Sequence, residues 1–509
     1  MADRGAFDRA EVRLGVAPVE PDAVPDPGTA FRIAVLGDFS ARGSRAGAAL
    51  RDPADRPPVL VDRDNIDEVM ARLGPELHLR GDDDTPEEVV RVTGLDDLHP
   101  DSLYDRLPSL SALRDLRKRA ADPRTARQAV REVLGQPERP APRAPRRAPS
   151  GASLLEQIVT ETAGAPARPE DSLAPAEDEL SRFVRKALVG SIVDPADPRQ
   201  PELLARLDGA ITARMRAVLH DPGFQAVEAL WRGVQLLVRR LETGPELKVY
   251  LVDVTRDELA ADLAGEGPVE GAGLYRLLVD GSVGTPGAAP WSLLVGCFGF
   301  GPEPGDVALL ARIAEIARAA GAPWLSAAEP LLAGWPSFEA TPEPESWSAP
   351  ESPEWEALRG RPEAASVGLV APRFILRLPY GASTDACEQF RFEEVDDPPM
   401  HDAFLWGNGA IAAALLLAET FSLEGWGMRP GARAEVGGCP LHVMRAGGLP
   451  RALPCAESLM PERSAGRMLE AGVMPLATLK DSDTVRLVRF QSIARPAAAL
   501  AGRWRADRR

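Results

Sequence analysis

The stretch Phe31-Arg-Ile-Ala-Val-Leu36 begins the first folded part of the chain and indicates the class of its fold. Apolar and polar residues alternate at its start and an apolar run follows, a pattern that predicts a β-strand. Gly37-Asp38 ends this strand, because glycine and aspartate favour turns. Val59-Leu-Val-Asp62 predicts a second short strand. We therefore expect a sheet to which this part of the chain contributes strands.

Helix and strand patterns alternate along the rest of the sequence. Further strands are predicted at 247–254, 291–298, 374–378 and 485–490. Apolar residues at helical spacing predict helices at 65–73, 101–119, 204–218, 224–234, 306–320 and 402–421. Asp64 and Asp402 are expected to cap their helices, and Gly321 to end helix 306–320. Strands alternating with helices predict an α/β fold with mixed sheets and flanking helices.

The composition is typical of a folded globular protein. The chain has 509 residues, 44% of them hydrophobic and 27% charged, and this length indicates two to four domains. A formal net charge of −17 argues against a nucleic-acid partner. Four irregularly spaced cysteines indicate no disulfide framework. We find neither a signal-peptide core nor a run of about 18 apolar residues, so we expect a cytoplasmic protein without membrane insertion.

The clearest linker is 137–149, Pro-Glu-Arg-Pro-Ala-Pro-Arg-Ala-Pro-Arg-Arg-Ala-Pro. Its five prolines disfavour helix and sheet, so this segment predicts a domain boundary. The predicted organisation is a flexible N-terminal arm (1–30), a first α/β domain (31–136), the Pro/Arg-rich linker (137–150), a helical connector (151–200), a second α/β domain (201–495) and a tail (496–509).

Motifs for cofactor or metal binding are weak. The sequence has no Gly-x-x-x-x-Gly-Lys-Ser/Thr phosphate loop, and Gly296-Cys-Phe-Gly-Phe-Gly301 lacks dinucleotide-binding spacing. We interpret this glycine-rich stretch as a tight turn from strand to loop. Cys439, His442 and Cys455 offer three zinc ligands, with Glu457 as a weak fourth. We interpret them instead as buried thiols and a turn histidine.

Pairs of residues that resemble catalytic pairs can also be interpreted as helix caps or turn residues. His401-Asp402 offers a base and an orienting carboxylate, but neighbours on a helix rarely face each other, so we interpret Asp402 as a cap. The pairs Asp62/Asp64, Asp96/Asp97 and Asp481/Asp483 lie at predicted turns or helix starts, where carboxylates accept backbone amides. The sequence therefore predicts no catalytic, cofactor-binding or metal-binding residue, and we expect no enzyme.

Both predicted domains resemble the contractile sheath of the type VI secretion system. The first resembles the small sheath subunit in Ile33-Ala-Val-Leu-Gly-Asp-Phe-Ser40, Val61-Asp-Arg-Asp-Asn-Ile-Asp-Glu-Val-Met70 and Leu95-Asp-Asp-Leu-His-Pro-Asp-Ser-Leu-Tyr104. The second resembles the large subunit in Leu219-His-Asp-Pro-Gly-Phe-Gln-Ala-Val-Glu-Ala-Leu-Trp-Arg-Gly-Val234, Pro372-Arg-Phe-Ile-Leu-Arg-Leu-Pro-Tyr-Gly-Ala382 and Leu405-Trp-Gly-Asn408. We expect the Trp231-Arg-Gly233 step to bury the ring in the core and to let the next helix approach. The resemblance implies both subunits fused in one chain.

The resemblance implies a structural subunit that polymerises with itself or other sheath subunits around a hexameric inner-tube protein. Contraction to a lower-energy packing would drive the tube outward and deliver effectors. A baseplate and a AAA+ sheath-recycling unfoldase are further implied partners, and no cofactor is implied. The family's large subunit presents a helix to that unfoldase, and Leu154, Leu155 and Ile158 lie on a similar predicted helix, 153–159. The alternative is a helix docked on its own domain.

This sequence differs from the family's large subunit in one respect. After Leu476–Gln491 the large subunit continues into a C-terminal part with strands of the inter-subunit mesh, whereas this sequence ends with Pro496–Arg509. A second function therefore stays open: a non-polymerising cap, adaptor or regulator that binds sheath or baseplate. An unrecognised enzyme is the third.

Overall fold

The structure is a computed structural model that describes residues 24–45, 47–79, 87–135, 197–283, 289–339, 342–348, 350–396, 399–446 and 449–504. It divides into two compact units, residues 1–110 with 212–509, and residues 111–211. Most of the predicted N-terminal arm, the linker, nearly all of the connector and the end of the tail lie outside the described residues. So does the predicted unfoldase-recognition helix with Leu154, Leu155 and Ile158.

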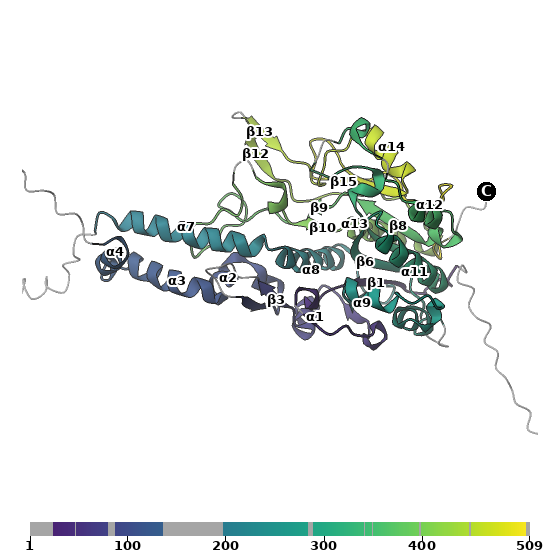
Figure 1. Cartoon of the computed structure of the whole chain (residues 1–509), viewed down its shortest axis with the longest axis horizontal. Helices are drawn as coiled ribbons and strands as arrows, with labels where there is room; N and C mark the ends of the chain where they lie inside the picture. The colour runs from purple at the N-terminus through teal and green to yellow at the C-terminus, as the bar shows by residue number, and fades with distance from the viewer. Residues whose placement is uncertain are drawn as a thin grey trace, which may run out of the picture. The chain divides into compact units, whose positions relative to one another are not determined.

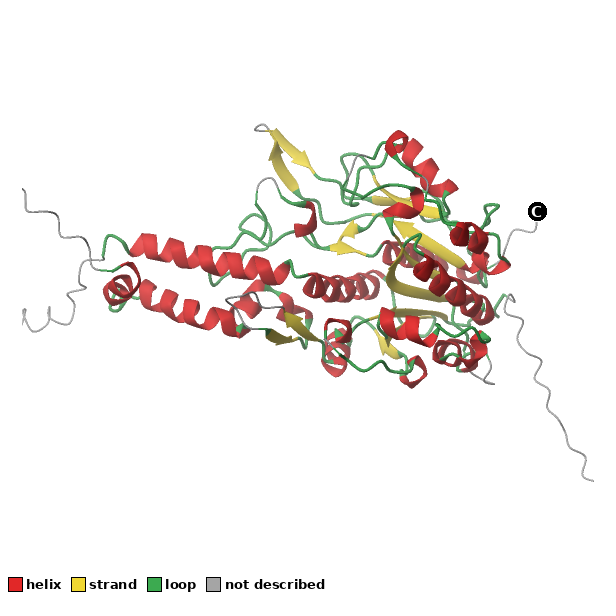
Figure 2. Cartoon of the chain, in the orientation of Figure 1, coloured by secondary structure: helices red, strands yellow, loops and turns green. Residues whose placement is uncertain are grey.

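Nine strands of the described chain form one mixed sheet in the larger unit (Figure 2). They are β1 (Phe31–Gly37), β2 (Val59–Val61), β5 (Leu247–Asp253), β6 (Leu293–Phe300), β7 (Trp324–Ala328), β8 (Val367–Ala371), β11 (Glu435–Val436), β14 (Val473–Thr478) and β15 (Val485–Leu487). The parallel part has the order β14-β8-β7-β6-β1-β5. Antiparallel β15 and β11 extend one end and antiparallel β2 the other. The predicted α/β fold with a mixed sheet is confirmed.

Strand β1 lies inside this sheet although it comes from the N-terminal part of the chain. Phe31–Gly37 pairs in parallel with Leu247–Asp253 of β5, and Ile33–Leu36 pairs with Leu293–Gly296 of β6. A parallel strand flanked on both sides is buried on both faces, which explains its continuous apolar run. The N-terminal strand therefore completes a sheet that the C-terminal half alone would leave divided.

Helices cover both faces of the sheet (Figure 1). In the larger unit they are α1 (Ile66–Leu73), α2 (Pro100–Arg106), α8 (Pro222–Arg240), α9 (Arg256–Asp262), α10 (Gly273–Tyr275), α11 (Pro304–Ala320), α12 (Pro353–Arg359), α13 (Gly409–Glu424) and α14 (Glu462–Glu470). Helix α11 packs against β6 and β7, and α13 contacts β6, β7 and β8 from the opposite face. The two faces of the sheet therefore each have their own apolar core.

Helix α8 packs across α13 where the Trp231-Arg-Gly233 step predicts a close approach. A Cβ at Gly233 would lie 3.3 Å from Ile411 Cγ1 of α13, so a larger residue would separate the helices. The Trp231 ring is fully buried, and its Nε1 donates to the Phe39 carbonyl at 3.1 Å. The predicted burial of the ring is confirmed, whereas the helix that approaches Gly233 is α13 and not the next helix along the chain, α9.

Two-stranded sheets flank the main sheet in the described chain. They are β3 (Glu76–Leu79) with β4 (Glu88–Arg91), β9 (Phe374–Ile375) with β10 (Trp406–Gly407), and β12 (Val443–Ala446) with β13 (Leu449–Ala452). Among the described helices, none is both long and apolar enough to cross a membrane.

The smaller unit is helical. It contains most of α3 (Pro108–Ala121), α4 (Ala126–Leu134) and the first part of α7 (Gln200–Leu219). Its apolar core consists of Ala120, Ala129, Val130, Leu203 and Leu207. Gln200 Nε2 donates to the Ala120 carbonyl at 2.8 Å, and Arg117 pairs with Asp208 at 2.6 Å. These contacts join residues far apart in the sequence.

Two helices in the structure differ from their predicted bounds. The predicted helix 101–119 is two helices, α2 and α3, because Leu107 is extended and Pro108 has no backbone N–H to continue the first. The predicted helix 402–421 begins only at Gly409, where Asn408 is the cap and accepts from Ala410 N at 2.9 Å. Asp402 lies in the separate 3-10 turn His401–Ala403 and is no helix cap.

Smaller corrections concern turns and strands. Asp64 does not cap α1; its backbone N–H and that of Asn65 instead donate to the Asp62 carboxylate. The predicted strand 374–378 shortens to Phe374–Ile375, because its partner β10 pairs with only these two residues. Arg377 beyond the strand enters a buried ion cluster. The glycine-rich stretch 296–301 is not a turn, since β6 runs through it to Phe300.

Candidate functional site

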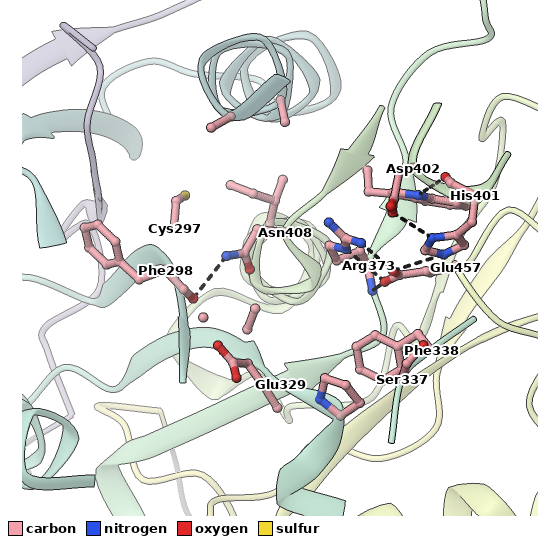
Figure 3. Close-up of a pocket in the computed structure, with 18 of the residues that line it drawn as sticks. Cys297, Phe298, Glu329, Ser337, Phe338, Arg373, His401, Asp402, Asn408 and Glu457 are labelled. Carbon is pink, nitrogen blue, oxygen red and sulfur yellow. Dashed lines mark hydrogen bonds and ion pairs between the residues drawn. The ribbon is translucent and has the colours of Figure 1, made fainter. Parts of the chain in front are cut away.

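A pocket of about 560 Å³ lies at the carboxyl ends of β6 and β7. In open α/β sheets, this is the edge where ligands bind. Helix α8 lines one side with Ala226, Ala229 and Leu230, and the start of α13 contributes Ile411. Other lining residues are Cys297, Phe298, Glu329, Ser337, Phe338, Arg373, His401, Asp402, Asn408 and Glu457 (Figure 3). Position and polarity make this pocket the candidate functional site.

His401 lies between two carboxylates at one side of the pocket (Figure 3). Its Nδ1 is 3.1 Å from Asp402 Oδ1, and its Nε2 is 3.2 Å from Glu457 Oε1. The contact with Glu457 raises the pKa of His401 above its usual value, against the burial that lowers it, and Asp402 adds to the rise. The expectation that His401 and Asp402 do not face each other is wrong, because they lie in a short turn outside α13.

Glu457 is the buried centre of this cluster, with its side chain 2% exposed. Arg373 holds both carboxylate oxygens, through Nη2 and through Nε at 2.9 Å, and its backbone N–H donates as well. Burial alone raises the pKa of Glu457, but His401 and Arg373 outweigh it and hold that pKa below its usual value. The ionised Glu457 therefore ties the start of β9 to the turn that carries His401.

The glycine-rich end of β6 makes room for a carboxylate. A Cβ at Gly301 would lie 2.7 Å from Glu329 Oε2, and one at Gly299 would lie 3.7 Å from Oε1. Glu329 directly follows β7, and its backbone N–H donates to the Phe300 carbonyl at 2.9 Å. These glycines therefore serve close packing around Glu329, whereas the sequence alone indicates a turn.

A second, largely buried cluster of charges includes two residues of α8. Arg377 Nε donates to Glu228 Oε1 at 2.7 Å, and its Nη1 donates to Glu394 Oε2 at 2.7 Å. Arg232 also pairs with Glu228 and donates to the Tyr380 hydroxyl at 2.9 Å. Burial favours neutral Glu228, but Arg377 and Arg232 outweigh it and lower its pKa. This cluster fixes the irregular segment after β9 to the middle of α8.

A third cluster joins the N-terminal part of the chain to the C-terminal part. Arg42 pairs with Asp253 at the end of β5 and with Glu258 of α9, the latter at 2.9 Å. Arg56 reaches the same two carboxylates at 3.1 and 3.0 Å. Burial raises the pKa of Glu258, but the Thr255 amide and Arg42 outweigh it and lower it. Two arginines thus satisfy two carboxylates more than 190 residues away.

The segment after β9 also contacts α2 directly. The Asp101 carboxylate accepts backbone N–H groups from Glu388 at 3.0 Å and from Gln389 at 3.2 Å. The Tyr104 ring stacks on Phe390 with centroids 5.0 Å apart. This segment therefore contacts α2 at one point and α8 at another.

The structure does not bring the four residues of the candidate zinc site together. Burial raises the pKa of the Cys439 thiol to about 11 and that of Cys455 to about 12. His442 packs its ring against Phe404, with centroids 5.3 Å apart, and Glu457 binds Arg373 and His401. Within the described ranges, no group of three or more His, Cys, Asp or Glu side chains is arranged so that it could hold a metal ion.

The pocket holds charged groups but no activated nucleophile among its described residues. Cys297 lines it, and burial raises the pKa of this thiol to about 12, so it is protonated at neutral pH. Arg373, Arg377, Glu228 and Glu394 form buried ion pairs that were not predicted from the sequence. Arg373 and Arg377 interrupt an apolar stretch, which is the signal of buried paired charges; Glu228 and Glu394 have no comparable signal.

Comparisons with known proteins place this architecture among sheath proteins. Residues 201–494 match the VipB family, described as the EvpB tail sheath N-terminal domain, and residues 12–139 match the VipA family of the type VI secretion system. A curated relative is the type VI secretion system sheath protein TssC1 of Pseudomonas aeruginosa, 33% identical over 308 residues. The alignment covers 58% of this chain and 61% of the relative, so the chain spans about three fifths of that protein's length.

Proposed function

Since this chain belongs to the type VI secretion sheath family and carries the VipA-type and VipB-type domains together, we propose that it is a structural subunit of a contractile sheath. In this role the chain polymerises with copies of itself or with other sheath subunits, in the cytoplasm, around a hexameric inner tube. The proposed role is mechanical and involves no catalysis.

The observation that carries the proposal is the position of β1. This strand lies in the VipA-matching range and pairs on both sides with strands from the VipB-matching range. The ion cluster of Arg42 and Arg56 with Asp253 and Glu258 joins the same two ranges. One chain therefore supplies both halves of one folded body, and the fusion keeps them at one-to-one stoichiometry.

A mechanical subunit needs a stiff body with contacts that propagate. Heterologous contacts between identical units generate an open helical polymer, and two alternative packings of such units store the energy of contraction. Buried ion clusters around α8 and β5 link distant segments of the larger unit, as a stiff body requires. The proposal further includes a baseplate as a partner, and a AAA+ unfoldase that recognises the helix containing Leu154, Leu155 and Ile158.

Electron microscopy of the purified full chain tests the function directly. We would image the protein by negative stain, alone and with the inner-tube protein, and measure its sedimentation. Tubes or stacked rings are the expected result. Only small discrete particles in both samples would contradict a polymerising subunit and indicate a cap, adaptor or regulator that binds sheath or baseplate.

A further inference from the structure

The pocket at the ends of β6 and β7 carries more negative than positive charge. Its charged lining consists of Glu329, Glu339, Asp402, Glu457, Arg373 and His401. Arg373 and His401 are already engaged by Glu457 and Asp402. Within the residues that the structure describes, neither Glu329 nor Glu339 has a basic partner. Four carboxylates against two basic groups leave about two negative charges unbalanced.

The uncharged lining includes aromatic and aliphatic side chains besides the polar Ser337 and Asn408. Phe298 and Phe338 line the pocket together with Trp406, whose ring stacks on His401. Figure 3 shows Glu329 on the side of the pocket opposite Asn408, with Phe298 and Phe338 to either side. A planar cation bound there would contact a carboxylate and aromatic faces together. Guanidinium meets both requirements, because it stacks on aromatic rings and donates in pairs to carboxylates.

Large apolar side chains close in the sequence to pocket-lining residues are exposed. Met400 is 73% exposed, Leu459 57% and Leu331 45%, and each lies within two residues of a pocket-lining residue. Exposed aliphatic groups around an acidic hollow fit a protein segment whose cation is flanked by aliphatic residues. A small free cation would leave these three side chains uncovered.

We propose that this pocket receives an arginine side chain, flanked by aliphatic residues, from an extended segment of a different, basic protein. The excess carboxylates of the pocket attract a basic partner, whereas this chain, with a net charge of −17, is itself acidic. The arginine pairs with Glu329 and Glu339 and packs its guanidinium on the aromatic lining. The proposal does not depend on the sheath function, because it concerns the folded larger unit alone.

Fluorescence anisotropy with a labelled peptide tests the proposal on the full chain. The probe is Gly-Leu-Arg-Leu-Gly, and its matched control has neutral citrulline in place of arginine. Removing one charge-assisted contact typically weakens binding about tenfold. We expect the citrulline peptide to bind about tenfold more weakly, and the double variant Glu329→Gln/Glu339→Gln to weaken the arginine peptide similarly. Raising the salt concentration should reduce both differences.

A second acidic pair provides the control variant. Glu242 and Glu246 are exposed and line a different hollow near α13, so Glu242→Gln/Glu246→Gln removes the same charge elsewhere. This variant should bind the arginine peptide as the unchanged protein does. Three results would overturn the proposal: no measurable binding of the arginine peptide, equal binding of both peptides, or equal weakening by the control variant. Because Glu329 and Glu339 are exposed, urea unfolding should confirm that their variant folds normally.

Discussion

Arg377 and Glu228 face each other inside the larger unit, with Nε 2.7 Å from Oε1 and side-chain exposures of 9% and 0%. Removing one member of a buried pair leaves the other charge without compensation and typically costs about 3–5 kcal/mol. We therefore expect Arg377→Met to lower the free energy of unfolding by about that amount, measured by urea denaturation followed by circular dichroism.

The matched control for this variant is Arg463→Met. Arg463 is 56% exposed and pairs with Glu343 and Glu345 at the surface, where ion pairs contribute about 0–1 kcal/mol. A similar loss in the free energy of unfolding in both variants would show that the buried Arg377 cluster contributes no more to stability than a surface ion pair.

The close packing of Gly296 against Trp324 predicts a large effect from one methyl group. A Cβ at Gly296 would lie 2.0 Å from Trp324 Cζ2, and the Trp324 ring is fully buried and hydrogen-bonded to Ser326. Overpacking a tight core typically costs about 1–3 kcal/mol or more. Gly296→Ala should therefore lower the thermal midpoint of unfolding by several degrees.

Gly305→Ala is the control for the packing effect. Gly305 lies in α11, and an added Cβ there would meet open space. Since alanine favours helix over glycine, this variant should keep or slightly raise the thermal midpoint. If Gly296→Ala behaves like Gly305→Ala, the close contact between β6 and Trp324 is absent in solution.

The His401–Glu457 pair predicts a stability contribution that depends on pH. The folded state raises the pKa of His401, so its contribution is fully present below the unfolded value of about 6.5 and is lost as the pH rises through the folded pKa. The folded state lowers the pKa of Glu457. The stability contributed by ionised Glu457 is therefore present above the pKa of an unfolded glutamate and is lost as the pH falls through the folded pKa. The cluster is therefore strongest in mildly acidic solution and weakens toward alkaline pH.

An NMR titration of isotope-labelled histidine side chains checks this assignment. In the unchanged protein His401 should titrate above its usual value, and in Glu457→Gln its pKa should fall because the largest cause of the rise is removed. His401→Gln identifies the resonance. A His401 pKa that stays the same in Glu457→Gln would contradict the ion pair.

The Asp101 carboxylate predicts local protection of the segment after β9. It accepts the backbone N–H groups of Glu388 and Gln389, and Asp101→Ala frees both of them. We expect about tenfold faster amide hydrogen exchange at these two residues, while exchange in β5 and β6 stays unchanged. Asp96→Ala, an exposed carboxylate just before α2, should leave all three regions unchanged. Equal exchange in both variants would mean that Asp101 does not hold this segment.

Local sequence signals determined much of the fold. The apolar run at Phe31 forms β1, the break at His220-Asp-Pro222 separates α7 from α8, and Gly321 ends α11 with a positive φ of 62°. The Asp221 side chain caps α8 by accepting from Gly223 and Phe224. These features depend on neighbours within a few residues, so the sequence pattern contains what is needed to predict them. The order of such segments also predicted the sheath family.

Only the tertiary structure decided how the charged residues are paired. Glu457 was considered as a weak zinc ligand, and Asp402 as a helix cap, yet both contact His401 at the edge of the pocket. Arg377 reaches Glu228 across 149 residues, and Arg42 reaches Asp253 across 211. A charge is neutralised by whichever opposite charge the fold brings within a few ångströms, and that distance depends on packing and not on separation along the chain. Strand periodicity likewise predicts β1 but not its neighbours, because parallel pairing joins segments through long crossover connections.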